Sequence, residues 1–238
     1  MKSSSSSAVR PLAFDAAGEG KPLILLHGLS GSRRWWTRNV PPLSRNFRIY
    51  RVDLPGFGES RAVHWTRLQD TAERLVAWMA DEGLDRVNIA GHSMGGAIAA
   101  LIAASFPERV DRLVLVDASI RPYGAPFAPR AADIVRAIDP GRGMTGLVTW
   151  DFLRSHPGSV AIATADLLRA DWGAHLRRIA APTLVIWGER DIITPLPLGH
   201  AITASIPDAR LVIVPNAGHT PMWEQPEVFN AELRRFLA

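Results

Sequence analysis

Short apolar runs alternate with stretches of helical periodicity along most of this chain, and that alternation constrains the fold more strongly than any other feature. Runs made mostly of apolar residues indicate strands that are buried on both faces. They occupy residues 22–26, 47–52, 86–90, 113–116, 183–187 and 210–214. Strands of this kind, separated by helices, predict an α/β fold with a mainly parallel, doubly wound sheet.

Spacing and glycine mark the helices between these strands. Leu68, Leu75 and Met79 lie at helical spacing, and Gly83 stands where the C-terminus of that helix belongs. A last helix is expected over residues 226–237.

One interval breaks the alternation. Between residues 120 and 181 there is no convincing strand, only short amphipathic pieces separated by proline and glycine. An insertion of this length between two buried strands is too long for an ordinary loop. We therefore expect a small helical cap at 120–181, inserted before the last two strands. Residues 1–119 and 182–238 would form the core, with 1–9 as a polar arm.

Composition excludes several kinds of site and partner. The 238 residues include no cysteine, so there is no disulfide, no thiolate metal site and no cysteine nucleophile. Lysine and arginine number 27 against 23 acidic residues, which gives a net charge of +4, and they are dispersed. Proteins that bind nucleic acid concentrate basic residues in a patch. We expect no nucleic-acid partner.

Targeting signals are also missing from the pattern. The polar start, with serine at positions 3–7, lacks the apolar core of a signal peptide. The longest mainly apolar stretch, 97–106, is about half of the ~20 residues that span a bilayer. We expect no membrane span, a cytoplasmic location and a monomer or homodimer.

The strand at 86–90 leads into Gly91-His92-Ser93-Met94-Gly95, and an alanine-rich helix follows. This is G-x-S-x-G in the strand-to-helix context of a nucleophile elbow. The glycines permit a sharp turn with closely packed neighbours, and the serine Oγ points out of the sheet near the positive end of the helix. The pattern predicts that Ser93 is a nucleophile.

A serine hydroxyl needs a base that is oriented by an acid. His219 follows the last predicted strand, in a loop shaped by Gly218 and Pro221, and is the candidate base. His92 adjoins the serine, so its side chain should diverge from the Oγ atom, which favours a packing role.

Asp191, just past the strand that precedes it, is the candidate acid. Two alternatives stay open. Asp117 ends an earlier strand and could also reach His219, whereas Glu189 is closer to its strand end and favours a loop-shaping role. The order Ser93, Asp191, His219 is that of an α/β-hydrolase triad, and each residue follows the carboxyl end of a strand.

Attack by serine creates an oxyanion, which two backbone N–H groups should bind. Met94, directly after the nucleophile, supplies one of them. Leu29, in the loop after the first predicted strand, supplies the other.

From residue 22 to the C-terminus the chain resembles the α/β-hydrolase superfamily. The resemblance rests on His27-Gly28, on DLPGFGES at 53–60, on GHSMGG at 91–96, on GERD at 188–191 and on Gly218-His219. It implies an α/β-hydrolase fold, a catalytic triad and a cap at 120–181 that shapes the substrate pocket.

A serine esterase-like member of that superfamily would cleave small to medium uncharged carboxylic esters through an acyl-enzyme. Its partner would be a small-molecule, ester-like substrate. Lactone hydrolysis, carbon–carbon bond hydrolysis and cofactor-free perhydrolysis on the same triad stay open. A slow-turnover ligand receptor of the same fold is the alternative from another class.

No cofactor or metal is expected. The chain has no Walker A or HExxH sequence, and the G-x-G-x-x-G match at 141–146 has no strand before it. Large apolar side chains that could line a substrate pocket complete the predicted site. They are Trp35, Phe57, Trp150, Phe152, Trp172 and Met222.

Overall fold

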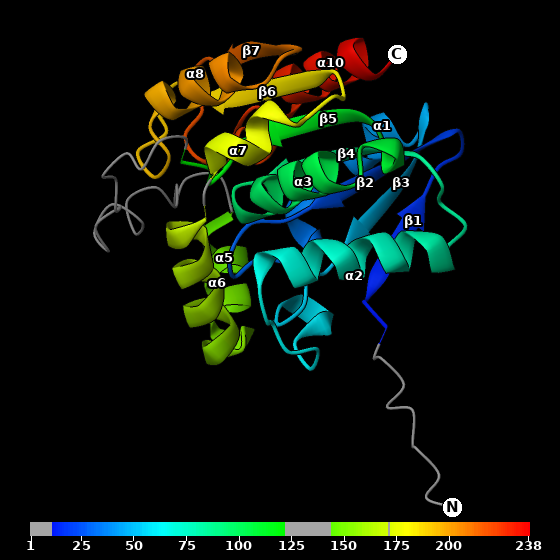
Figure 1. Ribbon diagram of the computed structural model, residues 1–238, viewed down its shortest axis with the longest axis vertical. Coiled ribbons are helices and arrows are strands. Elements are labelled where there is room, and N and C mark those ends of the chain that lie inside the picture. The colour runs from blue at the N-terminus through cyan, green and yellow to red at the C-terminus, as the bar shows by residue number, and fades with distance from the viewer. Residues whose placement is uncertain (1–10, 122–143, 171) are drawn as a thin grey trace, which may run out of the picture.

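The computed structural model describes residues 11–121, 144–170 and 172–238 (Figure 1). The predicted polar arm at 1–9 and residues 122–143 of the predicted cap lie outside the described residues.

The described strands form one sheet in the order β1-β3-β2-β4-β5-β6-β7. Every neighbouring pair is parallel except β1 with β3, which is antiparallel. The strands are β1 (Phe14–Ala17), β2 (Lys21–Leu26), β3 (Phe47–Val52), β4 (Val87–His92), β5 (Val110–Val116), β6 (Thr183–Gly188) and β7 (Ala209–Val214). A mainly parallel α/β sheet, as predicted from the apolar runs, is confirmed.

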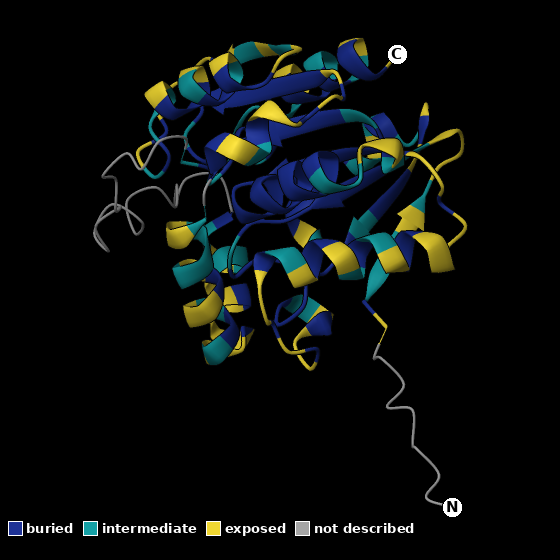
Figure 2. Cartoon of the chain, viewed as in Figure 1, coloured by how far each residue is buried: buried dark blue, intermediate teal, exposed yellow. Residues whose placement is uncertain are grey.

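Side chains alternate between the two faces of this sheet, and both faces are covered. In β2, Ile24 and Leu26 pack into one hydrophobic core, whereas Leu23 and Leu25 pack into the other. Strands β4 and β6 are accordingly buried over their whole length, and β2 and β5 over their last four residues (Figure 2). Burial on both faces explains why these strands are continuous apolar runs rather than alternating ones.

Helices form a layer on each face. One layer consists of α2 (Leu68–Asp81), α3 (Met94–Ser105), α7 (Trp172–Arg177) and α8 (Leu196–Ser205). The other consists of η1 (Arg33–Trp36), α1 (Val40–Leu43), α9 (Pro221–Glu224) and α10 (Pro226–Leu237). Short 3-10 turns complete the core at η2 (Gly58–Ser60) and η3 (Pro107–Arg109). None of the helices in the described parts of the chain is both long and apolar enough to cross a bilayer.

Gly83 ends α2 as predicted. Its φ is +69°, a backbone conformation that glycine adopts without steric cost. The Leu84 amide then bonds back to the Met79 carbonyl at 2.8 Å, and the Gly83 amide to the Ala80 carbonyl at 3.1 Å. This pair of bonds satisfies carbonyls at the end of the helix.

Strand β1 is not among the strands that the sequence predicts. It has only four residues and includes the charged Asp15, so it makes no apolar run. The strand forms through contacts with its neighbour. It pairs with β3, and the Asp15 carboxylate accepts hydrogen bonds from the Arg51 side chain at 2.7 and 2.8 Å. A short edge strand that depends on cross-strand contacts gives little local signal.

The interval at 120–181 contains no strand within its described residues. Its helices are α5 (Met144–Arg154), α6 (Pro157–Arg169) and α7. Figure 1 shows α5 and α6 beside the sheet rather than in its two helical layers. The division of the chain into a core and a cap stays a prediction.

The carboxylate of Asp151 fixes α5 to the segment that follows β2. Although charged, this side chain is buried. It accepts hydrogen bonds from the Ser32 hydroxyl at 2.7 Å, the Trp35 indole N–H at 3.0 Å and the Arg34 guanidinium at 2.5 Å. A buried carboxylate with three donors is satisfied, and without it the buried hydroxyl of Ser32 and the buried indole N–H of Trp35 would lose their acceptor.

Replacement of Asp151 by alanine should therefore destabilise the fold. Buried donors left without an acceptor cost about 1–3 kcal/mol, so the free energy of unfolding measured with urea should fall by about that amount. Asp208→Ala, at an exposed position, is the control. A loss no greater than that of the control would show that the contact contributes nothing to stability.

Candidate active site

Ser93 occupies a strained turn between β4 and α3. Its φ is +52° and its ψ is −116°, unusual for a residue with a side chain. Four backbone hydrogen bonds hold it there. The Ser93 amide donates to the Val116 carbonyl at 2.9 Å, and the Ser93 carbonyl accepts from the amides of Gly96, Ala97 and Ser119. Strain of this kind persists only where the surroundings over-determine it, and it concentrates at functional sites.

The packing of this turn requires a glycine at position 95, two residues after Ser93. A Cβ atom on Gly95 would lie 2.6 Å from the carbonyl oxygens of Leu26 and His27, closer than real Cβ contacts come. Because both neighbours are backbone atoms, neither could move aside. Glycine is therefore present at this position because the start of α3 packs closely against the end of β2.

The hydroxyl of Ser93 hydrogen-bonds the hydroxyl of Ser119, with 2.9 Å between the two Oγ atoms. Among the described residues this is the one hydrogen bond of Ser93 Oγ, and none joins it to His219. The structure thus places the predicted nucleophile next to a second serine that sequence reasoning missed. The sequence feature that could have indicated Ser119 is its position two residues after Asp117, near the carboxyl end of β5.

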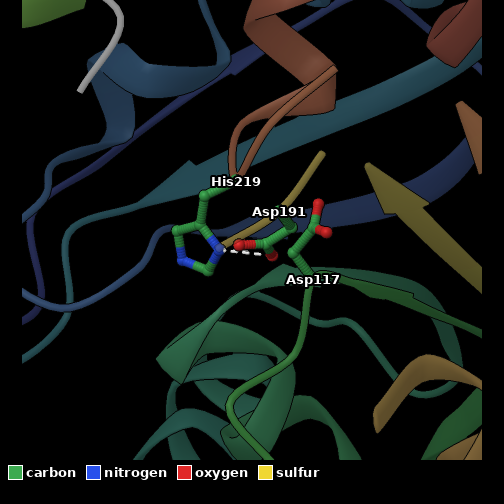
Figure 3. Close-up of side chains that lie close together, drawn as sticks. All are labelled: Asp117, Asp191 and His219. Atoms are coloured by element: carbon green, nitrogen blue, oxygen red, sulfur yellow. Dashed lines mark hydrogen bonds and ion pairs between the residues drawn. The ribbon is translucent and has the colours of Figure 1, made fainter. Parts of the chain in front are cut away.

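The predicted base and acid do meet. His219, after β7, and Asp191, after β6, are joined by a hydrogen bond of 2.8 Å from Nδ1 to the carboxylate Oδ2 atom (Figure 3). Both residues are buried. Since a carboxylate only accepts, Nδ1 carries the proton and the Nε2 atom of a neutral His219 is left as an acceptor.

Asp191 is held as an anion by its surroundings. Burial by itself raises the pKa of its carboxyl group, but the charge and hydrogen bond of His219 and further hydrogen bonds, including that of Thr194, lower the pKa to about 2. The Thr194 hydroxyl donates at 2.5 Å, and the amides of Ile193 and Thr194 donate at 2.8 and 3.0 Å. These donors fix the position of the carboxylate against the imidazole.

Neither of the two alternative acids is hydrogen-bonded to His219 within the described residues. Asp117 accepts a hydrogen bond from the Gly188 amide at 2.9 Å, and no hydrogen bond joins it to His219 within the described residues. Glu189 accepts from the Asn216 amide at 3.0 Å, so its carboxylate shapes the loop that leads to His219.

His92 does more than fill space. Its Nε2 atom lies 2.7 Å from the backbone carbonyl of His219, and the two rings lie 4.8 Å apart. Since a carbonyl only accepts, Nε2 is the protonated nitrogen. Burial, followed by the charge of His219, lowers the pKa of His92 to about 3. A neutral His92 therefore ties the loop of the predicted base to the turn of the predicted nucleophile.

The amides of Leu29 and Met94, predicted to bind an oxyanion, have no acceptor within the described residues. His27 supports the Leu29 loop: its Nδ1–H donates to the Gly28 carbonyl at 2.8 Å, and its Nε2 accepts from the Leu54 amide at 3.0 Å. Burial lowers the pKa of His27, in keeping with a neutral ring. Two amide donors without acceptors are what an oxyanion site requires.

Asp117, Asp191 and His219 also form a cluster of metal-ligand type, with one atom from each within 4.8 Å of the others. In this arrangement Nδ1 of His219 carries the proton that it donates to Asp191, so that nitrogen serves the contact with Asp191. The absence of a metal stays a prediction from the sequence.

The predicted pocket residues fall into three groups. Phe57, Trp172 and Met222 are fully buried in the two hydrophobic cores. Trp150 and Phe152, on α5, are 52% and 58% exposed. Trp35 is also buried, and its ring centroid lies 5.7 Å from that of His92. A role for any of them in a substrate pocket stays a prediction.

Comparison with known proteins agrees with this architecture. A pimeloyl-(acyl-carrier protein) methyl ester esterase of Nitrosomonas europaea is 30% identical over 244 residues, covering 91% of this chain and 95% of the relative. A 2-hydroxy-6-oxononadienedioate/2-hydroxy-6-oxononatrienedioate hydrolase of Pseudomonas putida is 28% identical over 262 residues, covering 94% of this chain and 90% of the relative.

Among solved structures, a thermophilic esterase from Thermogutta terrifontis superimposes with a TM-score of 0.81 at 29% identity, over 95% of this chain and 92% of that one. The family model described as "Alpha/beta hydrolase family" matches residues 23–232, nearly the whole of the sheet and its helices. The chain belongs to the alpha/beta hydrolase family.

Proposed function

We propose that the protein is a serine hydrolase that cleaves carboxylic esters, with Ser93 as nucleophile, His219 as general base and Asp191 as the acid that orients it. The hydrogen bond of 2.8 Å between His219 and Asp191 carries this proposal. It leaves a basic Nε2 atom on a loop at the same end of the sheet as the strained turn of Ser93.

The first half of the reaction forms an acyl-enzyme. For attack, the Ser93 hydroxyl exchanges Ser119 for Nε2 of His219 as its hydrogen-bond partner. Its Oγ atom bonds to the ester carbonyl carbon while its proton passes to Nε2. The negative charge on the carbonyl oxygen is stabilised by the amides of Leu29 and Met94, each worth about 2.7–4 kcal/mol in comparable sites.

Collapse of this intermediate breaks the bond to the alcohol oxygen, and His219 gives its proton to the leaving alkoxide. Water then attacks the acyl carbon and gives a proton to Nε2. The bond to Ser93 Oγ breaks, the carboxylic acid leaves, and the serine recovers its proton. Asp191 keeps its charge throughout and stabilises the imidazolium.

The choice of esters rests on the relatives. Two of the proteins compared above are named as esterases, one of them a methyl ester esterase. Small to medium uncharged esters are proposed from the short cap expected in the sequence. The cytoplasmic location and the monomeric or homodimeric state stay predictions.

Carbon–carbon bond hydrolysis is the second candidate. The observation in its favour is the Pseudomonas putida relative, whose named substrate is an oxo-dienedioate. Both activities would use the same triad, so the geometry described here supports either one. The third candidate is a receptor that binds its ligand and turns it over slowly. Sustained multiple turnover of a substrate would support an enzyme rather than a receptor.

Ser93→Ala should lower kcat/KM for a p-nitrophenyl ester by roughly 10⁴-fold or more, because it removes the oxygen on which the proposed acyl-enzyme forms. Ser44→Ala, whose hydroxyl makes only an exposed hydrogen bond of 3.4 Å to the Pro41 carbonyl within the described residues, is the control and should behave as wild type. A fluorophosphonate should label the peptide that contains Ser93, as read by mass spectrometry. Near-native activity of Ser93→Ala, or labelling at Ser119, would remove Ser93 as the nucleophile.

Asp191→Asn should reduce kcat/KM far more than Asp117→Asn does. The first substitution removes the carboxylate that fixes the proton of His219 on Nδ1, whereas the second leaves that bond in place. The two variants make the same chemical change a short distance apart, so each controls for the other. The opposite ranking would assign the acid to Asp117.

A substrate panel decides between the candidate reactions. Aryl and alkyl esters of increasing chain length, lactones and a 2-hydroxy-6-oxo-dienoate should be compared by kcat/KM under one condition. We expect the highest value for a short or medium ester. A maximum for the dienoate would replace the esterase proposal, and single-turnover binding with no ester cleaved would favour the receptor.

A further inference from the structure

A second buried carboxyl group stands beside the Asp191–His219 pair. Asp117 directly follows β5, its side chain is fully buried, and its φ is +40°, a strained value for a residue other than glycine. Figure 3 shows it next to Asp191, with His219 on the other side of that residue. One atom from each of the three residues lies within 4.8 Å of the others.

The two carboxyl groups accept very different numbers of hydrogen bonds. Asp191 receives four: His219, the Thr194 hydroxyl, and the amides of Ile193 and Thr194. Within the described residues, Asp117 receives one, the Gly188 amide on Oδ1. Its Oδ2 atom is buried, and no group in the described parts of the chain donates to it.

A buried oxygen of this kind cannot stay anionic beside another anion. Two like charges this close in a low-dielectric interior do not both persist, and the proton goes to the group with fewer donors. Burial, followed by the charge of Asp191, raises the pKa of Asp117 well above its usual range. A proton on Oδ2 also gives that atom a hydrogen bond to donate, and the Asp191 carboxylate is the acceptor that lies next to Asp117 (Figure 3).

We propose that Asp117 is a neutral carboxylic acid whose Oδ2–H donates to Asp191, so that the two carboxyl groups share one negative charge beside His219. Asp117 is then a positioning residue: it acts on the base through Asp191 and takes over the charge when Asp191 cannot hold it. The charged and titratable groups that face Asp117 are Asp191, His219 and Glu224. Only the catalytic consequence rests on the proposed function.

The proton itself can be tested without any activity. In the unfolded chain Asp117 loses its proton above about pH 4, whereas in the folded protein it keeps it. The free energy of unfolding of the wild-type protein then falls as the pH rises. A variant with no ionisable group at position 117 does not lose stability in this way. The urea midpoint of Asp117→Asn, relative to wild type, should therefore rise between about pH 4.5 and about pH 7.5.

Asp208→Asn is the control, since Asp208 is exposed and its replacement should give the same difference at both pH values. A constant or falling difference for Asp117→Asn would overturn the proposal. If that variant does not fold, infrared spectra of wild-type protein carrying ¹³C-labelled aspartate decide. They should show the C=O stretch of a protonated carboxyl group at neutral pH, and its absence would overturn the proposal.

The consequence for catalysis is tested by a double substitution. Asp191→Asn should keep residual activity because Asp117, freed of its charged neighbour, ionises beside His219. Adding Asp117→Asn should lower kcat/KM by about tenfold or more again, whereas adding Asp208→Asn to Asp191→Asn should not. Equal activity of Asp191→Asn with and without Asp117→Asn would remove this role.

The pH profile supplies the readout that a purely structural role would not move. A neutral Asp117 that donates to Asp191 weakens the field at His219, so its loss in Asp117→Leu should shift the acid limb of kcat/KM to higher pH. An ionised Asp117 would give the opposite shift. A lower or unchanged limb contradicts the proposal. If the protein cleaves no ester at all, the proposed function fails, while the stability measurement still decides whether Asp117 carries the proton.

Discussion

The strained turn at Ser93 is the constraint on which the rest of this site depends. Its positive φ is unfavourable in isolation and is held by hydrogen bonds to β5, to α3 and to the Ser119 amide. These partners exist only because β4 and β5 lie side by side in the sheet and because glycine lets α3 approach β2. The turn in turn presents the Ser93 hydroxyl at the carboxyl edge of the strands.

The carboxyl edge also determines the electrostatics. Asp117, Asp191 and His219 follow three strands that are neighbours in the sheet, so these titratable groups meet in a buried region where any charge on one acts strongly on the others. Four donors make Asp191 the favoured place for the negative charge, and the backbone carbonyl of His219 is tied to His92. His219 is thus held through both its side chain and its main chain.

Much of this could be predicted from the sequence because it is written in local patterns. Buried parallel strands must be apolar, and a sharp strand-to-helix turn must have glycine. Other features depend on contacts across the fold and leave little local trace. Strand β1 is ordered by pairing with β3, Ser119 reaches Ser93 only through the sheet register, and α5 is fixed by the buried Asp151 carboxylate with donors more than 100 residues away in sequence.

The sequence alone determined the parallel α/β sheet, the turn that carries Ser93, and the set of residues that could serve it, since each follows from a short apolar run or a glycine-bearing loop. Only the tertiary structure decided which carboxyl group holds His219. Asp117 and Asp191 both follow strands, so the apolar runs do not rank them, and the sequence favoured Asp191 only through residue order and the GERD stretch of the family resemblance. The ranking comes from the number of donors that surround each carboxyl group, and those donors are assembled only when β5, β6 and β7 pair.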